Sequence, residues 1–220
     1  MPLGRYEYRL AWNGIPAASA TVDVSRGIEP DASYEVRGEV KTNWLVDLLW
    51  SLRANVTARF TPPDLAPLGF VYDRRIRGDP TITEVVFEDG DRGATGTARH
   101  AGASRVMAVD APGVLDPVTA IFRALGEPLE AGETLGYDVF TGEALYRVEL
   151  YVEREENIVV GGHRYDAWRM QPRLWRSGSG AESRLRQATI WVSRNPARTV
   201  LRVRSEVFIG AVTVDLMKFS

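Results

Sequence analysis

The stretch Tyr34-Glu-Val-Arg-Gly-Glu-Val-Lys41, YEVRGEVK, alternates apolar or small residues with charged residues along its whole length. Successive side chains of a β-strand point to opposite faces, so this alternation predicts a strand with one buried and one solvated face. Residues 143–154 and 211–219 repeat the pattern. Because such alternation is typical of antiparallel sheets with one face in water, we expect an all-β fold.

Turn signals divide the chain at the short intervals that hairpins and meanders require. They are Asn13-Gly14, Asp89-Gly90, Thr141-Gly142, Gly161-Gly162 and Asn195-Pro196. Few connections between the predicted strands are long enough for a crossover helix, which favours antiparallel pairing. The prediction is therefore a large bent antiparallel sheet or open barrel. The Gly-rich stretch 88–105 is expected to be a loose hairpin or a mobile loop.

The composition is that of a folded globular protein, with 220 residues of which 45% are hydrophobic and 25% charged. This length suits one all-β domain over 1–220, in which 1–100 and 101–220 are sub-halves with a shared core. A formal net charge of -2 provides no basic field for nucleic acid, so no nucleic-acid partner is expected. The lack of cysteine excludes disulfides and thiolate metal sites.

Two segments break the alternation and follow a helical period instead. Apolar residues recur at helical spacing within 43–52 and within 117–125, and Asp116 is a suitable N-cap for the second segment. The first segment is too short to span a bilayer and contains Asp47. Both helices are too short to be stable alone, so we expect them to pack on the concave side of the sheet, their apolar faces covered.

Residues for hydrolytic or metal chemistry are sparse. His100 and His163 are the only histidines, and neither belongs to a known metal-ligand spacing, so we expect no metal and no cofactor. No Gly-x-Ser-x-Gly elbow is present. Carboxylates are numerous, but spacing within a sheet does not identify a glycosidase pair. We therefore expect a protein that is not an enzyme, with a carboxylate-based hydrolase of an envelope polymer as an alternative.

Arginine and tryptophan are interleaved on two neighbouring predicted strands near the C-terminus. Arg169 and Arg173 stand close to Trp168 and Trp175 in the first of these strands. Arginine beside aromatic rings can hold a phosphate or carboxylate head group while the rings cover an apolar chain. A solvated outer face of the sheet would also explain these charges, and the sequence leaves both interpretations open.

Six motifs occur in an order that resembles the bacterial domain-of-unknown-function family 3108. They are WNGIPAASA (12–20), TNWLVDLLW (42–50), LDPVTAIFRAL (115–125), VFTGEALYRVEL (139–150), ATIWVSRNPARTVLRVRS (188–205) and IGAVTVDL (209–216). The resemblance implies a curved all-β protein exported to the periplasm. The usual export signal is missing from this sequence, so we expect that the signal peptide has been removed. The layout is similar to that of carriers that hold an apolar ligand in an open half-barrel.

These observations lead to the expectation of a non-catalytic periplasmic binding or carrier protein for a lipid or acyl chain. The residues expected at the ligand are Trp44, Leu45, Leu48, Leu49, Ile121, Phe122 and Leu125, with Trp168, Trp175, Arg169 and Arg173 near its head group. The alternative is a structural or assembly partner in a cell-envelope complex, with an envelope protein bound at sheet edges or loops. Whether the two helices plug the core or line a cavity is open at this stage.

Overall fold

The computed structural model describes residues 2–27, 33–48, 50–88, 93–177, 188–206 and 210–220. The first eight strands are β1 (Gly4–Trp12), β2 (Ile15–Arg26), β3 (Tyr34–Thr42), β4 (Leu52–Thr61), β5 (Ala66–Ile76), β6 (Asp79–Phe87), β7 (Ala94–His100) and β8 (Ala103–Val109). The other six are β9 (Thr134–Phe140), β10 (Leu145–Val160), β11 (His163–Arg176), β12 (Ala188–Ser193), β13 (Val200–Glu206) and β14 (Ala211–Phe219). The helices in the described ranges are α1 (Trp44–Asp47) and α2 (Pro117–Gly126).

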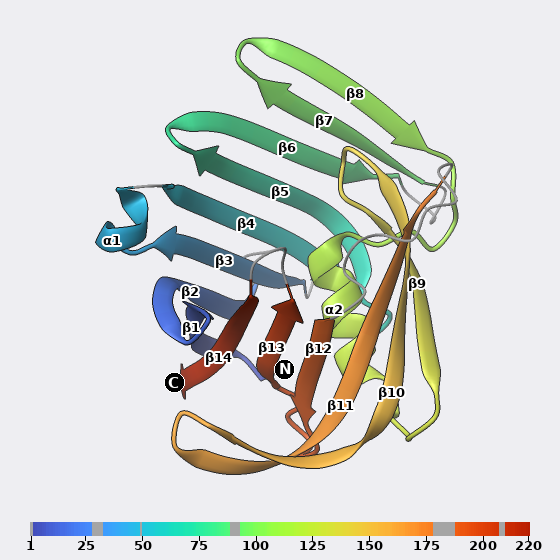
Figure 1. The fold of residues 1–220 in the computed structure, drawn as a ribbon. Coiled ribbons are helices and arrows are strands. Elements are labelled where there is room, and N and C mark those ends of the chain that lie inside the picture. The colour runs from blue at the N-terminus through green and yellow to red at the C-terminus, as the bar shows by residue number, and fades with distance from the viewer. Residues whose placement is uncertain (1, 28–32, 49, 89–92, 178–187, 207–209) are drawn as a thin grey trace.

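All fourteen of these strands belong to one sheet, and each neighbouring pair is antiparallel. β1 to β8 form one meander, and β9 to β14 form a second one. The segment that contains α2 connects the two meanders along the chain, and pairing of β1 with β14 joins them within the sheet (Figure 1). The predicted all-β fold with a large antiparallel sheet is confirmed.

The join between β1 and β14 brings the two ends of the described chain together. The backbone N–H of Arg5 donates to the Ser220 carbonyl oxygen at 2.8 Å, and Ser220 returns a hydrogen bond to Arg5 at 3.0 Å. The rings of Tyr6 and Phe219 stack with 4.6 Å between their centroids. Both ends of the sequence therefore lie in the middle of the sheet, and its two edges are β8 and β9.

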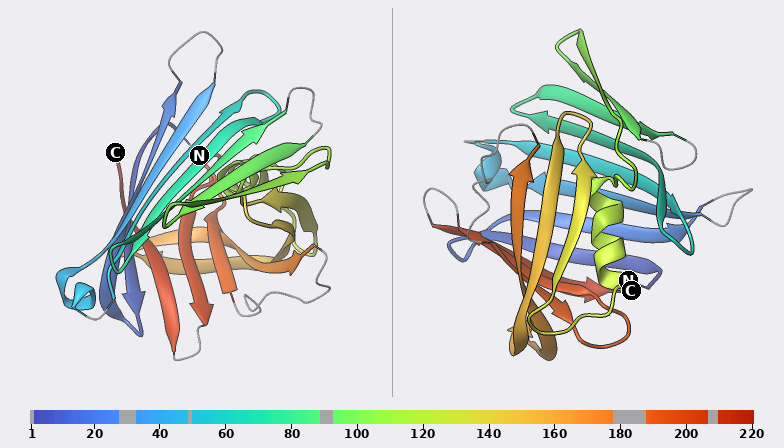
Figure 2. Two further views of the ribbon diagram at one scale, coloured as in Figure 1. Left: turned by 90° about the horizontal axis from the view of Figure 1, so that it is seen from above. Right: turned by 90° about the vertical axis from the view of Figure 1, so that its right-hand side faces the viewer.

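The sheet bends so strongly that its two halves face each other, and α2 lies between them (Figure 2). Asp116 begins this helix as its N-cap and accepts hydrogen bonds from the backbone N–H groups of Val118 at 2.9 Å and Thr119 at 3.0 Å. Phe122 then packs against Phe60 of β4, with 5.2 Å between ring centroids. The prediction of a helix on the concave side is confirmed for α2.

The turn between β9 and β10 touches the N-terminal half of the sheet. Gly142 in this turn lies so close to Gly96 of β7 that a Cβ atom on Gly96 would collide with the Gly142 backbone. The hydroxyl of Thr83 in β6 donates to Glu143 at 3.2 Å. Of the two alternatives predicted for 88–105, the structure has the hairpin, since β7 pairs with β8, and the mobile loop is wrong for β7. Residues 89–92 lie outside the described part.

The helix predicted over 43–52 is only one turn long, and its apolar face is not covered. α1 ends at Asp47, and Trp44 and Leu48 are 73% and 76% exposed to solvent. Leu49 lies outside the described residues. The expectation that α1 packs on the concave side of the sheet was therefore wrong, and α1 projects instead from the end of β3 (Figure 1).

Polar contacts hold α1 beyond the end of the sheet instead of over it. The buried hydroxyl of Thr42 donates to Asp47 and accepts a hydrogen bond from the Leu52 backbone N–H at 2.9 Å. Arg53 forms an ion pair with Asp47 at 2.5 Å. The Asn43 side chain caps the helix by accepting from Val46 at 3.0 Å. This set of hydrogen bonds makes a compact turn between β3 and β4.

Candidate functional site

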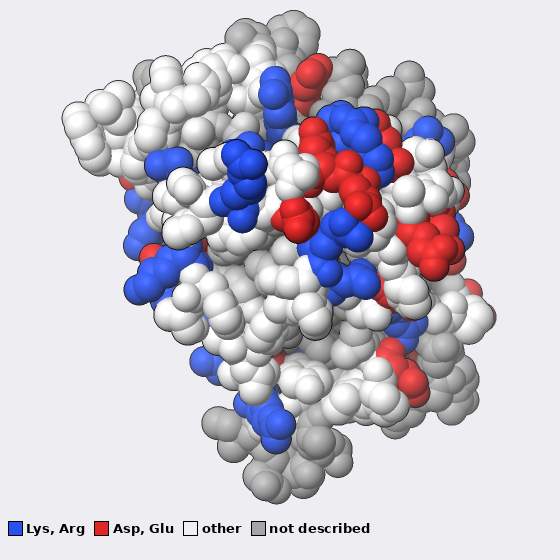
Figure 3. Space-filling model, turned by 90° about the horizontal axis from the view of Figure 1, so that it is seen from below, with Lys and Arg blue, Asp and Glu red and all other residues white. Residues whose placement is uncertain are grey.

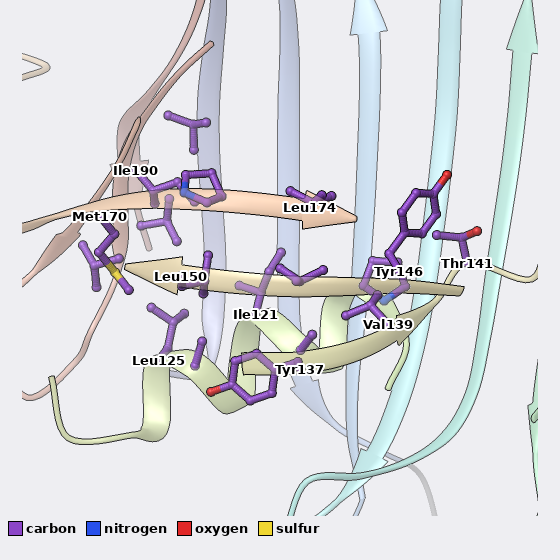
Figure 4. A pocket seen from close by; sticks show the side chains of 18 residues that line it. Ile121, Leu125, Tyr137, Val139, Thr141, Tyr146, Leu150, Met170, Leu174 and Ile190 are labelled. Atoms are coloured by element: carbon purple, nitrogen blue, oxygen red, sulfur yellow. The ribbon is translucent and has the colours of Figure 1, made fainter. Parts of the chain in front are cut away.

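A groove of about 490 Å³ lies between α2 and the concave face of the C-terminal half of the sheet (Figure 4). Its lining consists of Pro117, Ala120, Ile121, Ala124, Leu125, Tyr137, Val139, Thr141, Tyr146, Val148, Leu150, Met170, Pro172, Leu174, Ile190, Val192, Val200 and Val203. The volume falls within the range of about 300 to 1,000 Å³ that is typical of small-molecule sites.

The strand side of the groove follows directly from two-residue alternation. Val148 and Leu150 of β10 point to the concave side, and their partners across the strand pair are Leu174 and Pro172 of β11. The same face continues into β12 with Ile190. These neighbouring apolar side chains form a continuous floor.

α2 supplies the opposite wall. Ile121 and Leu125 lie one turn apart and face the groove, as Figure 4 shows. Phe122, the next residue after Ile121, points away from the groove to Phe60. The structure thus places the predicted residues Ile121 and Leu125 at the groove and Phe122 in the core against the N-terminal half of the sheet.

Among the described residues that line the groove, the polar side-chain groups are hydroxyls, and none of these residues is charged. Tyr146 and Thr141 lie together at one end of the groove, and Met170 lies toward the other end (Figure 4). The Thr141 hydroxyl donates to the Ala144 carbonyl at 3.2 Å. The pKa of Tyr137 is raised to about 12, chiefly by burial and also by Glu127, while Arg123 opposes the rise. The groove is therefore suited to an uncharged, apolar part of a ligand.

The predicted head-group residues do not lie at this groove. Arg169, Arg173 and Trp175 alternate along β11 with the groove residues and so belong to the other face of the strand. Arg169 lies 2.8 Å from Glu153 and 5.7 Å from the centre of the Trp191 ring. The same alternation of side chains that predicts these strands places the arginines on the face opposite the groove.

Trp168 does belong to the inner face, but as a core residue. It is buried in a cluster with Leu125 and Met170, and the guanidinium of Arg194 lies 5.0 Å from the centre of its ring. It is not part of the groove lining. Its neighbours Leu125 and Met170 do line the groove, so Trp168 supports the site from behind.

The predicted residues of the first helix lie elsewhere. Trp44, Leu45 and Leu48 are exposed on or next to α1, and none of them lines the groove. Leu49 is outside the described residues. The hypothesis that both helices form walls of one cavity is wrong for α1, because α1 lies in the turn between β3 and β4, away from the groove.

Sequence reasoning missed most of the floor of the groove. Val148, Leu150, Pro172 and Leu174 are placed there by the register between β10 and β11. Alternation identified Val148 and Leu150 as members of one face. The missing information was the position of α2, which leaves space over this part of the sheet.

A second depression of about 610 Å³ differs sharply from the groove in its chemistry. Arg202 holds Asp215 there with two hydrogen bonds, of 2.5 Å and 2.9 Å, and the Trp191 indole N–H donates to Glu156 at 2.8 Å. Basic and acidic side chains also stand side by side on the lower face of the molecule (Figure 3). In the part of the chain that the structure describes, no group of three or more His, Asp or Glu residues is arranged to hold a metal ion.

The fold and the groove define the protein as a bent-sheet all-β protein with an apolar site between its helix and its sheet. Residues 7–217 match the family described as Protein of unknown function (DUF3108), and the chain belongs to this family. No curated protein matches the chain. Over the described residues, no helix has both the length and the apolar character needed to cross a membrane.

Solved structures of similar fold also exist. A β-barrel-like protein of the domain of unknown function DUF1849 from Brucella abortus has 11% identity and a TM-score of 0.64, and the match covers 99% of this chain and 98% of that one. A protein described as a candidate lipoprotein from Parabacteroides distasonis has 9% identity and a TM-score of 0.37, with 100% and 96% covered. The first of these likenesses supports the fold alone.

Proposed function

We propose that this protein is a non-catalytic binding or carrier protein for an apolar ligand, such as a lipid or a free acyl chain, in the periplasm. The groove between α2 and strands β9 to β13 is the observation that carries the proposal. The periplasmic location rests on the resemblance to exported envelope proteins in the order of the sequence motifs.

Incomplete burial of the groove floor supports this proposal. Leu150, Leu174, Ile190 and Val203 face the concave side, yet each remains only half-buried. Removing apolar surface from water stabilises a protein by roughly 25 cal/mol per Å². A ligand that covers these side chains would therefore be stabilised by burial of apolar surface that is exposed to water in the protein alone.

The size of that gain favours a chain of several methylene groups. Each buried methylene contributes about 0.8 kcal/mol, so ten of them contribute roughly 8 kcal/mol before entropy costs are subtracted. A dissociation constant near 1 μM requires a net binding free energy of about 8 kcal/mol, so more than ten methylene groups must be buried to reach it. Acyl chains of this length or longer are the expected ligands, since shorter ones would be held weakly.

The position of the ligand's polar end follows from the absence of charge in the lining. A carboxylate or phosphate placed deep in the groove would lose its hydration, and the described lining residues include no cationic partner for it. The acyl chain therefore occupies the groove, and its polar end stays in solvent or meets the hydroxyls near Tyr146 and Thr141.

Native mass spectrometry after gentle purification, followed by lipid extraction, tests the proposal. We expect an adduct with the mass of a lipid or fatty acid. Leu174→Trp should fill the groove and weaken fatty-acid binding about tenfold or more. Arg173→Trp makes a similar increase in apolar size on the other face of β11 and should bind like the unmodified protein.

Two results together would contradict the proposal. The first is a protein without a co-purifying lipid, and the second is no change in tryptophan fluorescence when fatty acids or phospholipids are added. Equal binding by the Leu174→Trp and Arg173→Trp variants would show that any bound ligand sits outside this groove.

A further inference from the structure

Six large apolar side chains lie exposed at one end of the N-terminal meander. This set, here called the tryptophan rim, consists of Trp12, Ile15, Trp44, Leu45, Leu48 and Trp50, and each of its members is at least 40% exposed. Three of the six tryptophans of the chain belong to it. Single exposed apolar residues are common on protein surfaces, but a group of this size marks a contact surface.

The members of the rim come from two neighbouring segments of the chain. The backbone N–H of Asn43 donates to the Ala17 carbonyl at 2.9 Å, and its side-chain amide donates to the Pro16 carbonyl at 2.6 Å. These bonds join the turn between β3 and β4, which holds α1, to the start of β2, next to the turn between β1 and β2. Figure 1 shows both turns at the same end of the sheet.

The turn that carries the α1 part of the rim is fixed to the sheet. Thr42, Asp47 and Arg53 fix the two ends of the α1 turn to the sheet through the hydrogen bonds and the ion pair described above. Asp47 is also neutralised by Arg53, which lowers the pKa of this carboxyl to about 2. The one carboxylate in this turn, Asp47, is therefore paired with Arg53 and does not leave an unpaired negative charge beside the rim.

A row of positive charge runs directly behind the rim. Lys41, Arg53 and Arg75 lie opposite one another on the neighbouring strands β3, β4 and β5. Neither Lys41 nor Arg75 forms an ion pair within the described residues. Arg53 is paired with Asp47, whereas Lys41 and Arg75 are available for contact with an anion.

Basic residues exceed acidic ones throughout this end of the meander. Ranges 41–53 and 74–79 contain five basic and two acidic residues. In Figure 3, the left-hand edge of the molecule, on the side where α1 lies in Figure 1, carries mainly basic side chains beside an uncharged projection. The surface thus combines an apolar tip with a cationic border.

We propose that the tryptophan rim docks on the surface of an anionic phospholipid bilayer, with its apolar side chains in the interfacial layer and Lys41 and Arg75 at the lipid phosphates. Tryptophan favours this layer, because its ring is amphipathic, and basic residues are attracted to anionic lipid head groups. This docking does not depend on the groove.

Co-sedimentation of the full chain with vesicles tests the proposal. Binding is expected to vesicles of phosphatidylglycerol and phosphatidylcholine, and to be much weaker with phosphatidylcholine alone. The double variant Trp44→Ser/Leu48→Ser should bind anionic vesicles about tenfold or more weakly. The double variant Val86→Ser/Val106→Ser changes two exposed apolar residues on β6 and β8, outside the rim, and should bind normally.

Brominated acyl chains provide a second measurement. They should quench the tryptophan fluorescence of the bound protein, and Trp44→Phe should reduce the quenched fraction. Leu174→Trp, which fills the groove, should leave vesicle binding unchanged and so separates docking from ligand binding. Absence of binding to anionic vesicles, equal binding by both double variants, or a self-association that Trp44→Ser/Leu48→Ser abolishes would each overturn the proposal.

Discussion

Phe122 of α2 and Phe60 of β4 pack ring against ring with 5.2 Å between their centroids, although they are far apart in the sequence. This contact fixes the helix to the N-terminal half of the sheet, while the preceding residue, Ile121, faces the groove on the other side. One helix thus closes the core with one face and bounds the groove with the other.

Phe122→Ala should therefore lower the free energy of unfolding by about 2 to 4 kcal/mol, because it removes a large apolar group from the core side of α2. Ile121→Ala is the matched control on the exposed side and should cost less than about 1 kcal/mol. Urea unfolding followed by circular dichroism measures both values. Equal losses would mean that α2 is not oriented as described.

Gly96→Ala should destabilise the fold by about 1 to 3 kcal/mol, because its new methyl group collides with the Gly142 backbone and pushes the β9–β10 turn away from β7. Gly126→Ala is the control, since a Cβ atom there meets no neighbour and alanine favours helix. Thermal unfolding compares the two. A neutral Gly96→Ala variant would show that the contact between these turns is loose.

Asp116 connects stability to pH. It is fully buried, and burial raises the pKa of this carboxyl above its usual 3.8, although hydrogen bonds from Thr119 and Val118 oppose the rise. Because the pKa is higher in the folded state, the protonated Asp116 side chain adds to the free energy of unfolding. This contribution is complete below pH 3.8 and is lost as pH rises through the folded-state pKa.

Asp116→Asn keeps a hydrogen-bond acceptor for the helix cap and removes this titration. The free energy of unfolding of the unmodified protein should therefore fall relative to that of Asp116→Asn as pH increases from about 4 toward neutrality. Asp116→Ala removes the cap and should cost about 0.5 to 2 kcal/mol. A stability difference between the unmodified protein and the Asp116→Asn variant that stays constant with pH contradicts the raised pKa.

Asp47 titrates in the opposite direction. Hydrogen bonds from Arg53 and Thr42 lower the pKa of Asp47 to about 2, so its contribution is present above pH 3.8 and is lost as pH falls through about 2. Arg53→Gln should return the pKa of Asp47 toward 3.8. Carboxyl NMR titration measures this shift, with Arg37→Gln as a control for the loss of one surface cation. An unchanged Asp47 pKa in Arg53→Gln would rule out the ion pair.

Alternation predicts the strands well where it reports burial on one face. Val36 lies in such a pattern and is almost fully buried, and the strand predicted around it matches β3 closely. β10 is longer than the predicted 143–154, because charged residues that resemble a turn continue the strand. Within this extension, Glu155 forms an ion pair with Arg194 at 2.6 Å.

The errors arise where packing between distant segments decides the structure. β7 resembles a loop in sequence, and the contact with Gly142 explains why its position 96 is a glycine. Trp44 and Leu48 suggest a core helix by their spacing, but the polar contacts of Thr42 and Asp47 keep the turn short and exposed. The sequence predicted Ile121 and Leu125 at the ligand site, and both line the groove. The groove itself was not predictable, because it depends on the distance between α2 and the strand that carries Leu150.

Pairing between β1 and β14 also affects how the chain can reach this structure during synthesis. The contact between Tyr6 and Phe219 spans almost the entire sequence, so it is among the last that a chain made from its N-terminus can form. Contacts of such long separation slow folding. Until β14 pairs with it, β1 is an unpaired strand edge through which partly folded chains can associate.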